Sequence, residues 1–131
     1  MVDRMQPEKS SHQLSCLRLA LRDLLEDLEK TLKVAFERSP LVKGNVYELA
    51  RQCGKPSCTC TRGRLHRSMV LSWSQQGKTR LRSIPPERLA ELRRKSEAYL
   101  RFRRSRARLG EIHHQMLALL DRIEQLRREE P

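Results

Sequence analysis

The chain has 131 residues and carries 28 Lys and Arg residues against 16 Asp and Glu residues, which gives a net charge of +12. This length suits one domain of ~100–200 residues and excludes two complete enzyme domains. An apolar fraction of 37% and an aromatic fraction of 4% predict a small core. The longest apolar run, Met116–Leu120, is too short to span a bilayer, and no apolar leader follows Met1. We therefore expect a cytoplasmic protein with no membrane partner.

The positive charge is concentrated in the middle of the chain. Between Arg38 and Arg108 there are 19 basic and 4 acidic residues, whereas the remainder has 9 basic and 12 acidic residues. The chain also holds 21 Arg and only 7 Lys residues. Because the planar guanidinium fork suits phosphate oxygens, this bias favours an acidic polymer as the partner.

The first expected elements are a flexible N-terminus over residues 1–11 and a helix over residues 12–38. Apolar residues recur in the helix at alternating intervals of three and four, as Leu14, Leu17, Leu21, Leu24 and Leu28. Cys16 lies between two of these leucines, and we expect it to be a small core residue. The helix should end before Pro40, because proline disfavours the helical conformation in the residue before it.

Residues 44–84 have the pattern of a small β unit. Val46–Leu49 is typical of a short strand, and Cys53–Arg67 of a tight loop. Ser68–Ser74 and Thr79–Ile84 predict a hairpin, with a glycine-containing turn between its strands. Alternation places three apolar side chains on one face of the first hairpin strand, namely Met69, Leu71 and Trp73. A sheet of this size is not stable alone in water and needs a further constraint.

Residues 86–129 predict one long helix, with Pro86 in its first turn and a possible kink or break at Gly110. Its distal half keeps a heptad spacing through Leu109, Ile112, Met116, Leu119, Ile123 and Leu126. The sequence thus predicts an α+β fold, mainly α. The N-terminal helix and the long C-terminal helix form a coiled coil, with a small zinc-stapled β-hairpin unit between them. The leucines of these two helices exceed what one helix pair can bury, which favours a homodimer or a larger protein partner.

A candidate metal site lies in the tight loop. Cys53, Cys58, Cys60 and His66 provide three sulfur donors and one imidazole. Structural zinc prefers four such ligands in a tetrahedron, and a bound ion would stabilise a unit with almost no core. We therefore expect one structural zinc ion. The alternatives are three reduced thiols, another metal, or a disulfide, which a cytoplasmic location disfavours.

The same residues carry a resemblance. The segment Cys53–Cys60 reads Cys-Gly-Lys-Pro-Ser-Cys-Thr-Cys and is followed by Gly63 and His66. It resembles the signature of a family of small, largely uncharacterised bacterial and archaeal proteins. The remaining matches are Gly77–Thr79 in the hairpin turn, Ile84–Pro85 and Tyr99, so that the resemblance spans about residues 44–125. It implies a metal loop, a location in the bacterial or archaeal cytosol or nucleoid, and an accessory role in transposition or integration.

Two arginine clusters are the candidate nucleic-acid contacts. One lies on the long helix and contains Arg93, Arg94, Arg101, Arg103, Arg104, Arg106 and Arg108. The other surrounds the metal loop and hairpin and contains Arg62, Arg64, Arg67, Arg80 and Arg82. Because aromatic residues for stacking on single strands are few, we expect duplex DNA or structured RNA. The alternatives are a solvated helix face and an anionic membrane surface.

No catalytic constellation is found in the sequence, which lacks a Gly-rich phosphate loop, a nucleophile elbow and an acidic cluster for Mg²⁺. We therefore expect a non-catalytic nucleic-acid-binding accessory protein rather than an enzyme. The alternative is an interaction adaptor whose coiled coil docks on a recombinase, nuclease or polymerase and which meets nucleic acid only in that complex.

Overall fold

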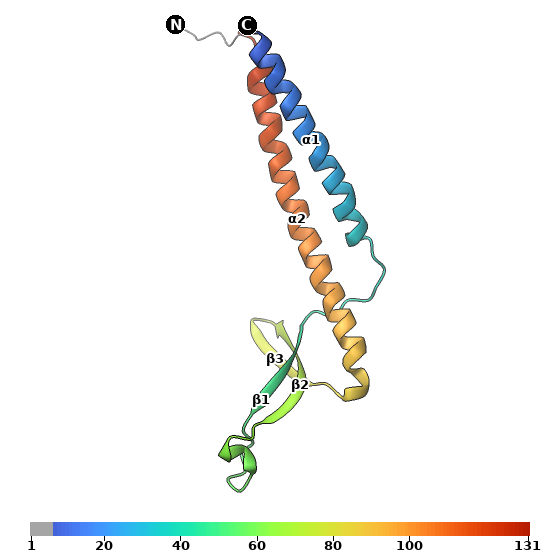
Figure 1. Ribbon diagram of the computed structural model, residues 1–131, viewed down its shortest axis with the longest axis vertical. Coiled ribbons are helices and arrows are strands. Elements are labelled where there is room, and N and C mark those ends of the chain that lie inside the picture. Colours follow the sequence, from blue (N-terminus) through green and yellow to red (C-terminus); the bar gives the residue numbers. More distant parts are fainter. Residues whose placement is uncertain (1–6) are drawn as a thin grey trace. The chain divides into compact units, whose positions relative to one another are not determined.

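A computed structural model describes residues 7–131 (Figure 1). The elements in chain order are α1 (Pro7–Ala35), β1 (Asn45–Arg51), the 3₁₀ turn η1 (Thr59–Arg62), β2 (His66–Gln75), β3 (Lys78–Ser83), the 3₁₀ turn η2 (Pro86–Arg88) and α2 (Leu89–Arg127). The chain divides into two units. Unit 1 comprises Met1–Glu37 and Phe102–Pro131, and unit 2 comprises Arg38–Arg101. The predicted α+β fold, with two helices around a small antiparallel sheet, is confirmed.

Unit 1 consists of α1 and the C-terminal part of α2, which lie side by side and antiparallel (Figure 1). Ile112 is fully buried and Ile123 is 9% exposed, whereas the other four members of the predicted α2 heptad are half-buried. The guanidinium of Arg108 pairs with the carboxylate of Asp27 and links the two helices. The predicted apolar stripe of α2 therefore forms the core of this unit.

The start of α1 and the place of Cys16 differ from expectation. The helix begins at Pro7 rather than at residue 12, because proline fits the first helical turn and Glu8 complements the helix dipole. Residues 1–6 of the expected flexible terminus lie outside the described part. Cys16 is exposed and not a core residue, since its position falls off the leucine stripe. Its Sγ lies 3.8 Å from Nε2 of His12.

Gly110 does not end α2, which continues through it as one helix. A glycine within a helix costs about 1 kcal/mol relative to alanine. Ile112 lies two residues further on and is fully buried, which helps to offset that cost.

Unit 2 contains a three-stranded antiparallel sheet in the order β1-β2-β3. The predicted short strand extends to seven residues as β1, and the predicted hairpin is formed by β2 and β3. Gln76 and Gly77 connect them with φ values of 52° and 76°. Two positive φ values in a two-residue loop match the twist of a hairpin.

The core of unit 2 lies between one face of this sheet and the beginning of α2. Leu71, Ile84 and Leu92 are its buried members, and Met69 and Trp73 pack against them. The prediction that Met69, Leu71 and Trp73 share a face is therefore confirmed. Since so few side chains are buried, hydrophobic burial supplies little stability to this unit.

Gly44 lies where the chain enters the sheet of unit 2. A Cβ atom at this position would meet the backbone oxygen of Ser72 and Cδ1 of Leu71, each at 2.8 Å. Its φ of +155° is also one that other residues rarely adopt. The carbonyl of Gly44 accepts a hydrogen bond of 2.5 Å from the buried hydroxyl of Ser96 on α2. Only glycine lets the chain pass this close to both β2 and α2.

We predict that Gly44→Ala destabilises the protein by about 1–3 kcal/mol, because a carbonyl of the central strand cannot move aside as a side chain can. The matched control is Gly54→Ala, since a Cβ at Gly54 meets nothing within 4 Å. Thermal and denaturant unfolding followed by circular dichroism measure both variants. Equal stability of the two variants would contradict the close approach at Gly44.

Candidate metal centre and basic surface

The antiparallel register of β1 and β2 brings the ends of the metal loop together. Arg51, the last residue of β1, is opposite His66, the first residue of β2. Cys53 follows β1 by two residues, so it lies beside His66 although thirteen positions separate them in the chain. The sheet therefore places the first and last donors of the cluster, and the loop between them places the other two.

The loop is folded by its own hydrogen bonds. The amide of Cys58 donates to the carbonyl of Lys55 at 3.1 Å, and the hydroxyl of Thr61 donates to the carbonyl of Cys58 at 2.7 Å. Cys58 precedes η1, and Gly63 ends it with a left-handed φ of 98°. This single turn directs Cys60 inward, where it is fully buried.

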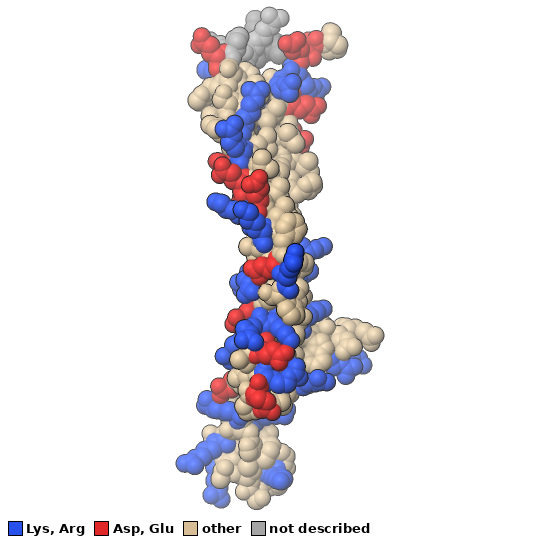
Figure 2. All heavy atoms as spheres, turned by 90° about the vertical axis from the view of Figure 1, so that its right-hand side faces the viewer, with Lys and Arg blue, Asp and Glu red and all other residues tan. Residues whose placement is uncertain are grey.

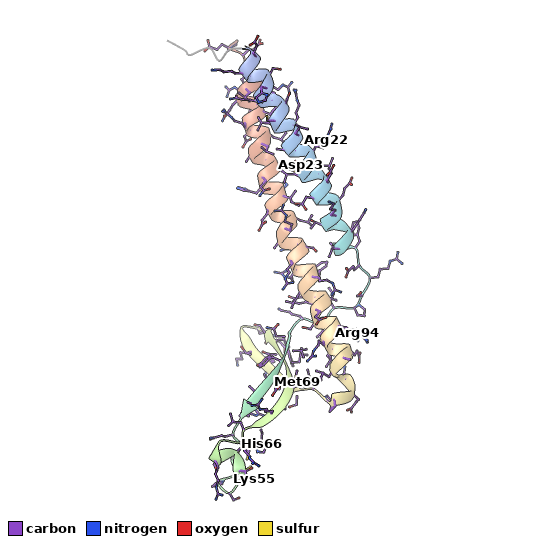
Figure 3. The ribbon with its side chains drawn as sticks, viewed as in Figure 1. Arg22, Asp23, Lys55, His66, Met69 and Arg94 are labelled. Carbon is purple, nitrogen blue, oxygen red and sulfur yellow. The ribbon has the colours of Figure 1, made fainter. Side chains whose placement is uncertain are left out.

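The four predicted donors form one cluster, at the lower end of the ribbon in Figure 3, where His66 is labelled. Sγ of Cys53 and Sγ of Cys60 are 3.5 Å apart, and Sγ of Cys58 is 3.1 Å from Nε2 of His66. All four ligand atoms lie within 4.8 Å of one another. Sulfur ligands at 2.3 Å from a tetrahedral zinc are about 3.8 Å apart, so the cluster fits one metal ion.

The surroundings shift the pKa values of two of the thiols in opposite directions. The pKa of Cys58 is lowered from 9.0 to about 6, first by the backbone amide of Cys60 and then by hydrogen bonds from Cys53, Cys60 and His66. For Cys60, the hydrogen bond from the amide of Cys53 lowers the pKa, but burial and the neighbouring thiols outweigh it, so the pKa is raised. The cluster thus offers a ready thiolate at Cys58, which is the form that binds a metal.

The register also groups the predicted arginines of the sheet. Arg82 is opposite Leu71, Arg80 is opposite Trp73, and Arg67 lies two residues before Met69 on β2. Directly paired and alternate residues share a face, so these arginines lie on the face that packs against α2. All three arginine side chains are nevertheless exposed, so they lie around the apolar core and not within it.

A lysine that the sequence analysis missed joins this group. Lys43 lines a cavity of about 230 Å³ together with Trp73 and Arg82. Nothing in its sequence neighbourhood distinguishes Lys43, because the contact depends on how the chain before β1 crosses the sheet.

The remaining predicted arginines lie in the metal loop and on α2. Arg62 and Arg64 are exposed in a loop without acidic residues, and Figure 2 shows only basic charges at this lower end of the visible face. On α2, the residues Arg93, Arg94, Arg101, Arg103, Arg104 and Arg106 are exposed as well. Arg108 differs, because it is half-buried and pairs with Asp27 and Glu111. Arg108 therefore links the two helices of unit 1.

Among residues 7–131, no helix combines the length and apolar character needed to cross a membrane.

We predict that the two shifted thiols react at different pH in metal-free protein. Because alkylating agents attack the thiolate, modification of Cys58 should rise with a midpoint near pH 6, and that of Cys60 at distinctly higher pH. Peptide mass spectrometry after brief iodoacetamide pulses between pH 5 and 9 resolves the two sites. A common midpoint for both thiols would show that the local hydrogen bonds do not distinguish them.

The comparisons with known proteins identify a family but no function. No curated protein and no solved structure matches the chain. The model of a protein family described as a domain of unknown function, DUF6788, matches residues 17–94, which is more than half of the chain. The match includes the sheet and all four donors of the metal cluster. The chain therefore belongs to the DUF6788 family.

Proposed function

We propose that the protein is a non-catalytic, nucleic-acid-binding accessory protein whose basic surface is held in shape by one structural zinc ion. The observation that carries the proposal is the charge of unit 2. Its residues 38–101 include 15 Lys and Arg against 4 Glu residues, and every predicted arginine in it is exposed. So large an excess of positive charge on so small a unit favours a polyanion.

Zinc is the proposed ion because of the donor set. Three thiols and one imidazole are soft or borderline ligands, and their spacing allows tetrahedral coordination. The hard cations Mg²⁺ and Ca²⁺ require oxygen ligands. An ion in the cluster would join the end of β1, the turn η1 and the start of β2, and so hold Arg62 and Arg64 in place. Reduced thiols of this kind are typical of the cytoplasm, which is where we place the protein.

Two surfaces are proposed to contact phosphates. The first, in unit 2, includes Arg62, Arg64, Arg67, Arg80, Arg82, Arg93, Arg94 and Arg101. The second, in unit 1, includes Arg103, Arg104 and Arg106, which crowd one stretch of α2. Since Trp73 is half-buried in the core, stacking on unpaired bases contributes little, and duplex DNA or structured RNA is the proposed partner.

The resemblance of the cysteine segment supports a role in transposition or integration in a bacterial or archaeal host. The second candidate function is an interaction adaptor that meets nucleic acid only inside a larger complex. The observation that favours it is the apolar surface of unit 1, where Leu25, Leu117 and Leu120 are 51%, 47% and 50% exposed. Binding to bare nucleic acid distinguishes the two functions.

We predict about one zinc ion per chain in protein purified without chelator. Cys58→Ser should remove it and lower the melting temperature by on the order of 10 °C, because unit 2 has little core to replace the ion. Elemental analysis and thermal unfolding measure the two effects. Cys16→Ser is the control, since this exposed cysteine lies outside the cluster and should change neither value. Unchanged stability and no bound zinc in the parent protein would contradict the zinc site.

We predict that the isolated protein binds duplex DNA or RNA at about 100 mM salt, with an affinity that falls steeply as salt rises. The triple variant Arg67→Gln, Arg80→Gln, Arg82→Gln should bind at least about tenfold more weakly, because each lost phosphate contact removes up to one released counterion. Fluorescence anisotropy across a salt series gives both the affinity and its slope.

The matched control for this experiment removes the same charge from the ends of the chain, as Arg18→Gln, Arg22→Gln and Arg128→Gln. If both triple variants lose equal affinity, net charge alone explains binding. If the parent protein fails to bind at about 50 mM salt, the adaptor function is favoured instead.

A further inference from the structure

An apolar groove runs along unit 1 between its two helices. It has a volume of about 630 Å³, and its apolar lining comes from Leu17, Ala20 and Leu24 on α1 and from Ala118 and Leu119 on α2. All ten of its lining residues belong to unit 1. The small side chains of Ala20 and Ala118 leave room for the side chains of another helix to pack into the groove.

The stripe of α1 is incompletely buried by α2. Leu14, Leu17, Leu21, Leu24 and Leu28 are all half-buried, and none of the side chains described on α1 is fully buried. An antiparallel pair of helices gains most of its stability from the apolar side chains between them. Because these side chains are only half-buried here, a further helix packed on them would add stability.

The charges along the groove indicate what this layer is. The charged lining residues of α1 are Asp23 and Asp27, and those of α2 are Arg108 and Arg122. Figure 3 labels Asp23 on α1. The groove therefore has one acidic and one basic edge, which makes it complementary to a second copy of itself when α1 of one copy faces α2 of the other.

The overall charge of unit 1 agrees with self-association. Residues 7–37 and 102–131 contain 12 Lys and Arg against 11 Asp and Glu residues. The near balance means that two copies of this unit do not repel each other strongly, unlike two copies of the basic unit 2.

We propose that the groove of unit 1 is the interface of a homodimer, a four-helix bundle in which α1 of each copy packs on α2 of its partner. This arrangement requires a two-fold axis parallel to the helices. Asp27 of one copy then lies level with Arg108 of the other, because the same two residues are paired within each chain. An axis perpendicular to the helices would place α1 on α1 and bring acidic edges together. The proposal does not depend on nucleic-acid binding.

The first experiment compares two neighbouring positions of α2. Ala118 is exposed in the single chain and lines the groove, whereas Leu117 is 47% exposed and does not line it. Ala118→Glu should raise the dimer dissociation constant at least about 100-fold, because it buries an unpaired carboxylate only in the dimer. Leu117→Glu should leave the dimer intact. Sedimentation equilibrium measures the association, and circular dichroism shows that both variants remain helical.

The second experiment tests which helices meet. Counting from the Asp27–Arg108 pair, Ala20 lies level with Gln115, and both line the groove. Two samples, one with Ala20→Cys and one with Gln115→Cys, each with Cys16→Ser and a different affinity tag, are mixed and treated with a short bismaleimide. The same mixture of tagged Cys16→Ser samples without an introduced cysteine gives the background from Cys53, Cys58 and Cys60, which is subtracted. Cross-links between the two tags support the proposal. Cross-links only within the Ala20→Cys sample, or a parent protein that is monomeric up to ~100 µM, would overturn it.

Discussion

Three thiols and an imidazole gather within 4.8 Å at one end of the sheet, and one ion bound among them would hold together the chain segments that meet there. The thiol of Cys58 has a lowered pKa, and its thiolate beside two further sulfur atoms carries a negative charge that a bound cation can neutralise. The proposed divalent ion would neutralise this charge and would at the same time join the end of β1, the turn η1 and the start of β2. The apolar core offers little in place of this link, since the buried cluster between the sheet and α2 consists of Leu71, Ile84 and Leu92.

The proposed ion and the basic surface are connected through the backbone. Arg62 and Arg64 lie in the loop between the third and fourth donors, and Arg67 follows the fourth donor directly. A flexible loop would lose conformational entropy when these guanidinium groups bind a phosphate backbone. Fixing the donors therefore fixes the charges, which is how a metal site without a catalytic role can serve binding.

In unit 1, an arginine of one helix pairs with an acidic residue of the other. Its arginines divide into exposed residues, such as Arg103 and Arg106, and Arg108, whose charge is taken up by Asp27 and Glu111. The pairing of Arg108 keeps the two helices in register. The groove beside it keeps one acidic and one basic edge, so the same residues that align the helices within one chain suit the proposed contact with a second chain.

Local patterns in the sequence determined much of this protein. The heptad of α2, the alternation of Met69, Leu71 and Trp73, and the Cys-x4-Cys-x-Cys segment are short-range features, and the fold class and the candidate donors followed from them. The start of α1 was missed because a polar segment with proline resembles a frayed end until the proline occupies the first helical turn. Only the tertiary structure decided the rest. The register of β1 on β2 brings Cys53 beside His66, the path at Gly44 admits no side chain, and Arg108 pairs with Asp27 across 81 positions. These contacts join residues far apart in the chain, and no local periodicity records which of many partners a side chain meets.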